Sequence, residues 1–285
     1  MFCPVKEWAC LLADKAIKTA AVAVGVSLAG AASAFALPQF TLDPAAAGLT
    51  GAAFTADNII LSDFATVAFT PNGTGGQNFT DNGILAVSGF QLGSSPVTVS
   101  GLNNTFGLYF QFTGTGIQNT VALNNNTVGT FSSLNYNLYG YAVSGAVSYL
   151  PSDTTPTGVS DPVLLATGAL IAGGVGATTI PGFGGVPNAN TLLTISPTTT
   201  SFFESPRPFY SADFAAFTNN PSQVVVSSSG FVINEGGGSV NFLEVSEPTS
   251  LALLATGLAS LVWIGGRRKH SNGSAQRVAD ALSSS

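Results

Sequence analysis

Apolar and polar side chains alternate at period two in several stretches of the chain, and this alternation constrains the fold more than any other feature. Along residues 105–113, the even positions from 106 to 112 hold Phe, Leu, Phe and Phe, whereas positions 107, 109 and 111 hold Gly, Tyr and Gln. Successive residues of a strand point to opposite faces of a sheet, so this pattern predicts a half-buried strand. Similar runs at 84–92, 134–143 and 223–233 predict further strands.

Clusters of Gly, Asn, Pro and Ser separate these runs and are typical of tight connections. The clearest are residues 71–76, 124–126 and 235–238. Signals for helices are scarce, because charged pairs four residues apart are absent and β-branched and aromatic residues are abundant. We expect one short helical turn at 213–219 and a buried hairpin at 163–177.

These patterns together predict an all-β fold over residues 37–244, in which an antiparallel β-sandwich-like extracellular domain is the simplest assembly. The apolar fraction of the chain, 45%, is sufficient for a buried core.

The charge distribution excludes one class of partner. Only 8% of the residues are charged, and between residues 37 and 246 the single base Arg207 stands against ten acids, a net charge of −9. An acidic body repels phosphate backbones, so we expect no nucleic acid partner.

The reactive residues that most enzymes need are missing from residues 37–244. Both cysteines, Cys3 and Cys10, come earlier, and the single histidine is His270. Catalysis by Ser-His-Asp or Cys-His groups and the usual zinc sites are therefore excluded for this segment. The sequence predicts no metal residues, although Ca²⁺ would suit the oxygen-rich loops at Asp57-Asn58, Asp81-Asn82 and 153–161.

The N-terminal segment has the three parts of a secretory signal in order. Residues 1–18 are mildly basic, residues 19–32 form a 14-residue apolar run, and Ala34-Phe35-Ala36 places small residues at the A-x-A positions. We expect residues 1–36 to be a signal peptide, with a helical apolar core, that signal peptidase cleaves after Ala36 or Ala34. A short buried helix is the alternative, but it explains neither the basic approach nor the small-residue exit.

A second apolar run, at 249–266, ends on the basic triplet Arg267, Arg268 and Lys269. Its 18 residues are just enough for a transmembrane helix in the precursor, and the triplet would stop transfer on the cytoplasmic face. Residues 270–285 then form a short disordered tail.

Residues 245–269 resemble a PEP-CTERM sorting signal, which combines a Glu-Pro motif, an apolar helix and an Arg cluster. The resemblance implies that an exosortase recognises Glu247 and Pro248 in the membrane-anchored precursor and severs or transfers the protein there. An ordinary single-span anchor is the alternative, since it needs only the helix and the triplet.

Segments of the body resemble the flocculation-associated PEP-CTERM proteins. They are SPRPFY at 205–210, FTNNPSQV at 217–224 and GGGSVNF at 236–242, together with GLY at 107–109. The resemblance implies a non-enzymatic protein of the cell surface or extracellular matrix that promotes floc or biofilm formation with exopolysaccharide.

We assign no catalytic residue from the sequence. Glycosidic cleavage needs only two carboxylates, so Glu204, Asp213 and Glu235 leave open the alternative of a secreted polysaccharide-acting enzyme. The tyrosines of the body would either stack on sugar rings or pack within the sheet; they are Tyr109, Tyr136, Tyr139, Tyr141 and Tyr210.

Overall fold

The computed structural model describes residues 37–99, 101–119, 128–171, 177–179, 188–218 and 220–243. The expected signal peptide, sorting signal and tail, and the turn cluster at 124–126, lie outside these residues. So do the residues predicted for processing and membrane arrest, namely Ala34, Ala36, Glu247, Pro248, Arg267, Arg268 and Lys269. In the part of the chain that is described, no helix has the length and apolar character needed to cross a membrane.

The compact unit that begins at Pro38 is built almost entirely of strands, so the predicted all-β class is confirmed. Its strands are β1 (Phe40–Leu42), β2 (Phe54–Ala56), β3 (Asn58–Pro71), β4 (Gln77–Leu92), β5 (Ser95–Val97), β6 (Phe106–Gln118), β7 (Val128–Ala142), β8 (Val163–Leu170), β9 (Ala177–Thr179), β10 (Asn188–Ile195), β11 (Phe203–Ser205), β12 (Ala212–Thr218), β13 (Val224–Ser227) and β14 (Gly230–Leu243). Three single-turn 3-10 helices, η1 (Ala45–Ala47), η3 (Thr200–Phe202) and η4 (Pro221–Gln223), join them.

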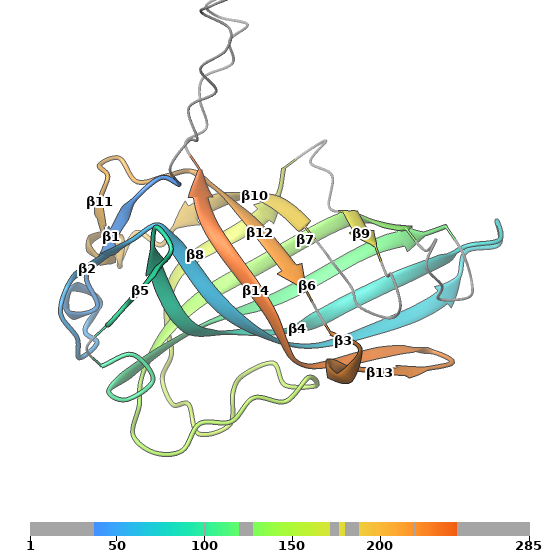
Figure 1. Cartoon of the computed structure of the whole chain (residues 1–285), viewed down its shortest axis with the longest axis horizontal. Helices are drawn as coiled ribbons and strands as arrows, with labels where there is room; N and C mark the ends of the chain where they lie inside the picture. Colours follow the sequence, from blue (N-terminus) through green and yellow to red (C-terminus); the bar gives the residue numbers. More distant parts are fainter. Residues whose placement is uncertain are drawn as a thin grey trace, which may run out of the picture. The chain divides into compact units, whose positions relative to one another are not determined.

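Eight of the described strands form a closed antiparallel barrel, in the order β12-β10-β8-β7-β6-β4-β3-β14 (Figure 1). The ring closes because β14 pairs with β3 along one edge and with β12 along the other, from Ala212↔Leu243 to Thr218↔Gly237. The antiparallel pairing that we expected is confirmed, but the sandwich is corrected to a barrel. A sandwich would leave sheet edges unpaired, whereas closure pairs them.

A small sheet of β11, β1 and β2 lies at one end of the barrel (Figure 1). Its Phe40 and Phe203 rings pack edge to face against Phe242 of β14, with centroids 4.8 and 6.4 Å apart. These rings belong to the same core cluster as the inward side chains of the barrel. The small sheet therefore extends the barrel core instead of forming a second domain.

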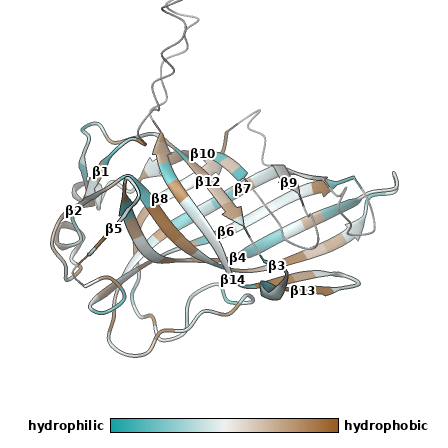
Figure 2. Cartoon of the chain, viewed as in Figure 1, coloured by the Kyte–Doolittle hydropathy of each residue, from teal (hydrophilic) through white to brown (hydrophobic). Residues whose placement is uncertain are grey.

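The predicted two-faced strands are confirmed in β6 and β7. Leu108 and Phe110 point into the barrel and are buried in its core, whereas Tyr109 and Tyr141 point outward. Both hydrophobic and hydrophilic residues lie along the barrel strands (Figure 2).

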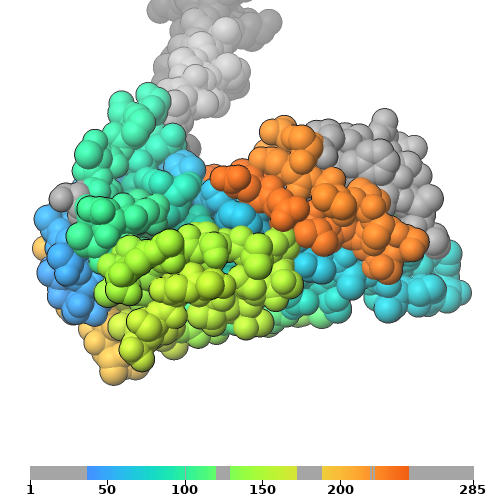
Figure 3. All heavy atoms as spheres, turned by 90° about the horizontal axis from the view of Figure 1, so that it is seen from below, coloured from blue at the N-terminus to red at the C-terminus, as the bar shows by residue number. Residues whose placement is uncertain are grey.

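The outward tyrosines are buried as well, because residues 143–161, here called the cover segment, lie against the outside of the barrel (Figure 3). The Tyr149 ring of this segment stacks on Phe64 of β3, with centroids 5.4 Å apart, and its hydroxyl lies 2.7 Å from that of Tyr141. The barrel thus has an inner core and a second apolar layer outside.

Three local predictions were wrong. The described part of the helical turn expected at 213–219 is a strand, since β12 covers Ala212–Thr218 and pairs with β10 and β14. The Gly-rich stretch at 235–238 is no turn but part of β14, where a bulge with positive φ at Glu235 shifts the register. The run at 223–233 is divided into β13 and the start of β14 by a tight connection. Of the hairpin expected at 163–177, the described strand residues are β8, which pairs with β7 and β10, and Ala177 at the start of β9, which pairs with the same two strands.

Candidate functional site

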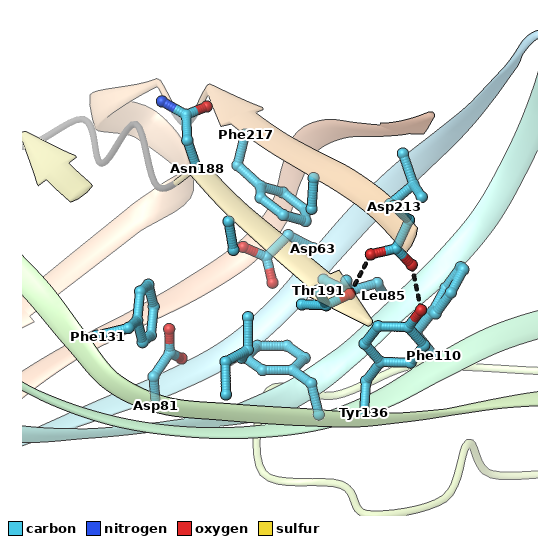
Figure 4. Close-up of a pocket in the computed structure, with 15 residues that line it drawn as sticks. Asp63, Asp81, Leu85, Phe110, Phe131, Tyr136, Asn188, Thr191, Asp213 and Phe217 are labelled. Carbon is cyan, nitrogen blue, oxygen red and sulfur yellow. Dashed lines mark hydrogen bonds between the residues drawn. The ribbon is translucent and has the colours of Figure 1, made fainter. Parts of the chain in front are cut away.

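Two places in the described fold gather polar side chains, and the first is a cavity of about 60 Å³ inside the barrel, here called the inner cavity (Figure 4). Three aspartates from three strands point into it: Asp63 from β3, Asp81 from β4 and Asp213 from β12. Tyr136, Asn188 and Thr191 complete its polar lining, and Phe, Leu, Val and Ala side chains form the rest.

Asp213 is held by two hydroxyl groups. The Tyr136 hydroxyl donates to its Oδ2 and the Thr191 hydroxyl donates to its Oδ1. Burial raises the pKa of Asp213 to about 6, although the hydrogen bonds from Thr191 and Tyr136 favour the charged form and lower it in part. The same burial and the neighbouring carboxylate raise the pKa of Tyr136 well above 10.

The Asp81 carboxylate has fewer hydrogen-bond partners than that of Asp213. Its Oδ1 is buried and has no hydrogen-bond partner within the described residues. Burial raises the pKa of Asp81 to about 7, because the carboxylate gives up its hydration without a compensating contact. At mildly acidic pH the inner cavity therefore holds protonated carboxyl groups.

A glycine makes the Tyr136 position possible. Gly168 of β8 lies directly opposite Tyr136 of β7, and a Cβ atom at Gly168 would overlap the Tyr136 ring. The missing side chain lets the ring cross the neighbouring strand and bring its hydroxyl to Asp213.

The inner cavity is not suited to sugar cleavage. Its volume is far below the roughly 300–1,000 Å³ of typical ligand pockets. Glu204 on β11 and Glu235 on β14 are exposed and do not line it, so the structure does not unite the three carboxylates considered from the sequence.

Nor do the described residues assemble a metal site. Among them, no three His, Cys, Asp or Glu side chains lie close enough together to hold a metal ion. Of the loops considered for Ca²⁺, Asp81 faces the inner cavity, Asp57 accepts a hydrogen bond from the Gly93 amide at 2.6 Å, and Asp153 accepts one from the Leu150 amide at 3.2 Å.

The second place is an open groove of about 580 Å³ on the outside of the barrel, here called the outer groove. Its floor crosses four neighbouring strands and its wall is formed by residues 151–154 of the cover segment. The Thr66 hydroxyl donates to the Pro151 carbonyl oxygen at 3.1 Å and so ties the wall to β3.

The floor of the outer groove carries a row of uncharged polar side chains. Thr66 of β3 is paired with Asn82 of β4, Asn82 with Thr113 of β6, and Thr113 with Asn135 of β7. Here the Thr113 hydroxyl donates to the Asn82 amide oxygen. Gln111 and Asn137, also paired with each other, add a second, shorter row.

Part of the outer groove could be predicted from the sequence. The alternation at 134–143 predicted a strand, but the polar residues of β3 and β4 gave no separate signal, because only the pairing register aligns them. The tyrosines considered for sugar stacking are packed: Tyr109, Tyr136, Tyr141 and Tyr210 are buried and Tyr139 stacks on Tyr109. These tyrosines therefore pack within and against the sheet, which was the alternative to sugar stacking.

Comparison with known proteins identifies no relative: no family model, curated protein or solved structure matches the chain.

Proposed function

We propose that this chain is an exported, non-enzymatic surface or matrix protein that holds cells together in flocs or biofilm by binding exopolysaccharide in the outer groove. The observation that supports it best is the row of amide and hydroxyl side chains from Thr66 to Asn135, aligned across four strands.

Amide and hydroxyl groups suit a sugar ligand because each both donates and accepts hydrogen bonds, as sugar hydroxyls do. The groove is open along the barrel surface and is large enough for several sugar rings. A rigid, hydrogen-bonded sheet also holds the row in place before binding, which reduces the entropy lost on association.

A binding role fits the groove better than a hydrolytic one. Glycosidases use two carboxyl groups that flank the bond to be cut. Among the described residues that line the outer groove, Asp153 is the only one with a carboxyl group.

Export is supported by the sequence patterns at the two ends. On this proposal signal peptidase cleaves after Ala36 or Ala34, and an exosortase acts at Glu247 and Pro248 while 249–266 and the basic triplet hold the precursor in the membrane. The mature protein then lies at the cell surface or in the extracellular matrix.

The test is settling of a strain in which the gene is deleted, with cell-bound polysaccharide measured alongside. We expect the deletion strain to stay dispersed and the intact gene to restore settling. A gene with Glu247→Ala and Pro248→Ala should not restore it, while Glu244→Ala, an acid just before the motif, should restore it fully.

Normal settling of the deletion strain would refute the aggregation role. Full rescue by the Glu247→Ala, Pro248→Ala gene, with 249–269 still attached to the protein, would instead indicate a plain single-span anchored surface protein. Hydrolysis of exopolysaccharide by the purified chain, lost on Glu204→Gln or Glu235→Gln, would replace the binding role with an enzymatic one.

A further inference from the structure

Resting on the proposed function, we infer that the outer groove selects an uncharged glycan, which lies across the strands along the row from Thr66 to Asn135, and rejects polysaccharides that carry carboxylate or sulfate groups.

The first reason is the sign of the charge around the groove. Asp153 is the only charged residue that lines it among those described, and no described Lys, Arg or His is present to pair with an anionic sugar. Arg207, the one base between residues 37 and 246, lies elsewhere, and its Nε donates to the Glu204 carbonyl oxygen at 2.8 Å. With ten acids in the same segment, the field around the groove repels anions.

The second reason is the kind of hydrogen bond on offer. Recognition of carboxylate or sulfate groups relies on charge-assisted donors, above all the paired N–H groups of Arg. The floor instead offers neutral amides and hydroxyls, whose acceptor oxygens would face an anion unfavourably. A neutral sugar uses both the donors and the acceptors.

The direction of the glycan follows from the register. Across the strands four polar side chains follow one another at the spacing of paired strands, about 4.8 Å. Along the strands the groove is shorter. On one side of Thr66 and Asn82 lie Phe64 and Ile84, which the cover segment contacts, and on the other side Ala68 and Thr80 do not line the groove. A linear chain gains the most hydrogen bonds by crossing the strands.

Asp153 offers a way to separate charge from shape. Its Oδ2 accepts the Leu150 amide hydrogen, which helps to form the wall of the groove. Asn at this position retains an acceptor oxygen for that bond but removes the negative charge. The Asp153→Asn variant therefore keeps the wall of the groove and changes only the electrostatic field around it.

The test is affinity electrophoresis of the full chain in gels that contain either hydroxyethyl cellulose, a neutral glucan, or alginate, a polyuronate, with a chelator present to prevent bridging by divalent cations. We expect retardation by the neutral glucan and none by alginate. The Thr113→Val variant should bind the glucan at least about fivefold more weakly, because it keeps the side-chain shape and loses the hydroxyl.

Thr80→Val is the matched control, since Thr80 is an exposed outward residue of β4 that does not line the groove. It should leave binding unchanged, and the unfolding temperature of both variants should stay near that of the parent chain. Asp153→Asn should keep the glucan affinity and allow weak retardation by alginate.

Each remaining outcome has a distinct meaning. Stronger retardation by alginate than by glucan would overturn the inference and leave polysaccharide binding standing. Glucan binding that Thr113→Val does not weaken would place the ligand outside the groove and also overturn it. Absence of binding to either polymer would remove the proposed function together with the inference.

Discussion

At the scale of single residues, the inner cavity places carboxyl groups where they are more stable when protonated. Asp81 and Asp213 have pKa values of about 7 and about 6 in the fold, above the usual value of 3.8. The folded state therefore binds more protons than the unfolded chain between these limits, and the free energy of unfolding falls as pH rises through them.

We expect the chain to be most stable near pH 4 and to lose several kcal/mol of unfolding free energy by pH 8. Urea unfolding of the full chain at a series of pH values measures this loss. Asp81→Asn, which stays neutral throughout, should reduce the slope of the curve and stabilise the fold at pH 8, while the part of the slope that comes from Asp213 remains. The exposed Asp161 supplies the control, since Asp161→Asn should leave the pH dependence as it is. Stability that rises from pH 4 to pH 7 would contradict the assignment.

Gly168 is a second residue whose role can be measured. Gly168→Ala should destabilise the fold by about 1–3 kcal/mol, because the new Cβ overlaps the Tyr136 ring and displaces it from Asp213. In a Tyr136→Ala background the same change should cost much less. Equal costs in the two backgrounds, measured by chemical denaturation, would show that the clash is not the cause.

At the scale of elements, the cover segment turns part of the outer barrel wall into a second core. A short bridge holds it together: the Ser148 amide donates to the Thr157 carbonyl oxygen at 3.1 Å, and the Thr157 amide donates to the Ser148 carbonyl oxygen at 3.0 Å. Tyr149, next to this bridge, packs the segment against the barrel.

Removing the Tyr149 ring should loosen the cover segment without opening the barrel. In Tyr149→Ala we expect hydrogen exchange at the Ser148 and Thr157 amides to speed up by at least tenfold, while the amides of β4 and β6 stay protected. Tyr149→Phe keeps the stack on Phe64 and should exchange more slowly than Tyr149→Ala. Faster exchange throughout β4 and β6 in Tyr149→Ala would mean that the segment and the barrel unfold together.

The elements also show how far the sequence predicts this fold. Alternation located β6 and β7 and assigned their faces, because burial of one face leaves a local period-two signal. β12 was mistaken for a helical turn, since ADFAAFT contains small, helix-compatible residues and its strand pairing with β10 and β14 is set by distant residues. The glycines at 236–238 suggested a turn, yet in β14 Gly238 makes room for the Phe217 ring of β12.

The candidate sites were less predictable than the strands. Asp213 was considered for sugar cleavage and Asp81 for Ca²⁺ binding in a loop, and Asp63 was not singled out, because a single acid in a strand gives no sign of facing inward until the register is known. The outer groove depends on the pairing of four strands and on the position of residues 151–154, neither of which a local pattern encodes.

At the scale of the whole described unit, stability depends on closure by the last strand. A chain that stops at residue 229 lacks β14 and leaves β3 and β12 without their partner. We expect it to show no cooperative thermal transition and to aggregate. A chain that stops at residue 243 keeps every described strand and should unfold at the same temperature as the full chain, and equal folding of both truncations would refute the role of β14.

The pairing of β14 with β3 also has a consequence in time. It joins Ser239 to Ile60 across about 180 residues of sequence, so this part of the barrel forms only after nearly the whole body is available. Contacts so distant along the chain make folding slow. If the chain leaves the cell N-terminus first, as its signal pattern indicates, β3 to β12 emerge as an open sheet whose two edge strands lack their partner. Before β14 arrives, the protein is most exposed to proteases and to premature association. A tail that holds the precursor at the membrane would keep copies apart until β14 closes the barrel.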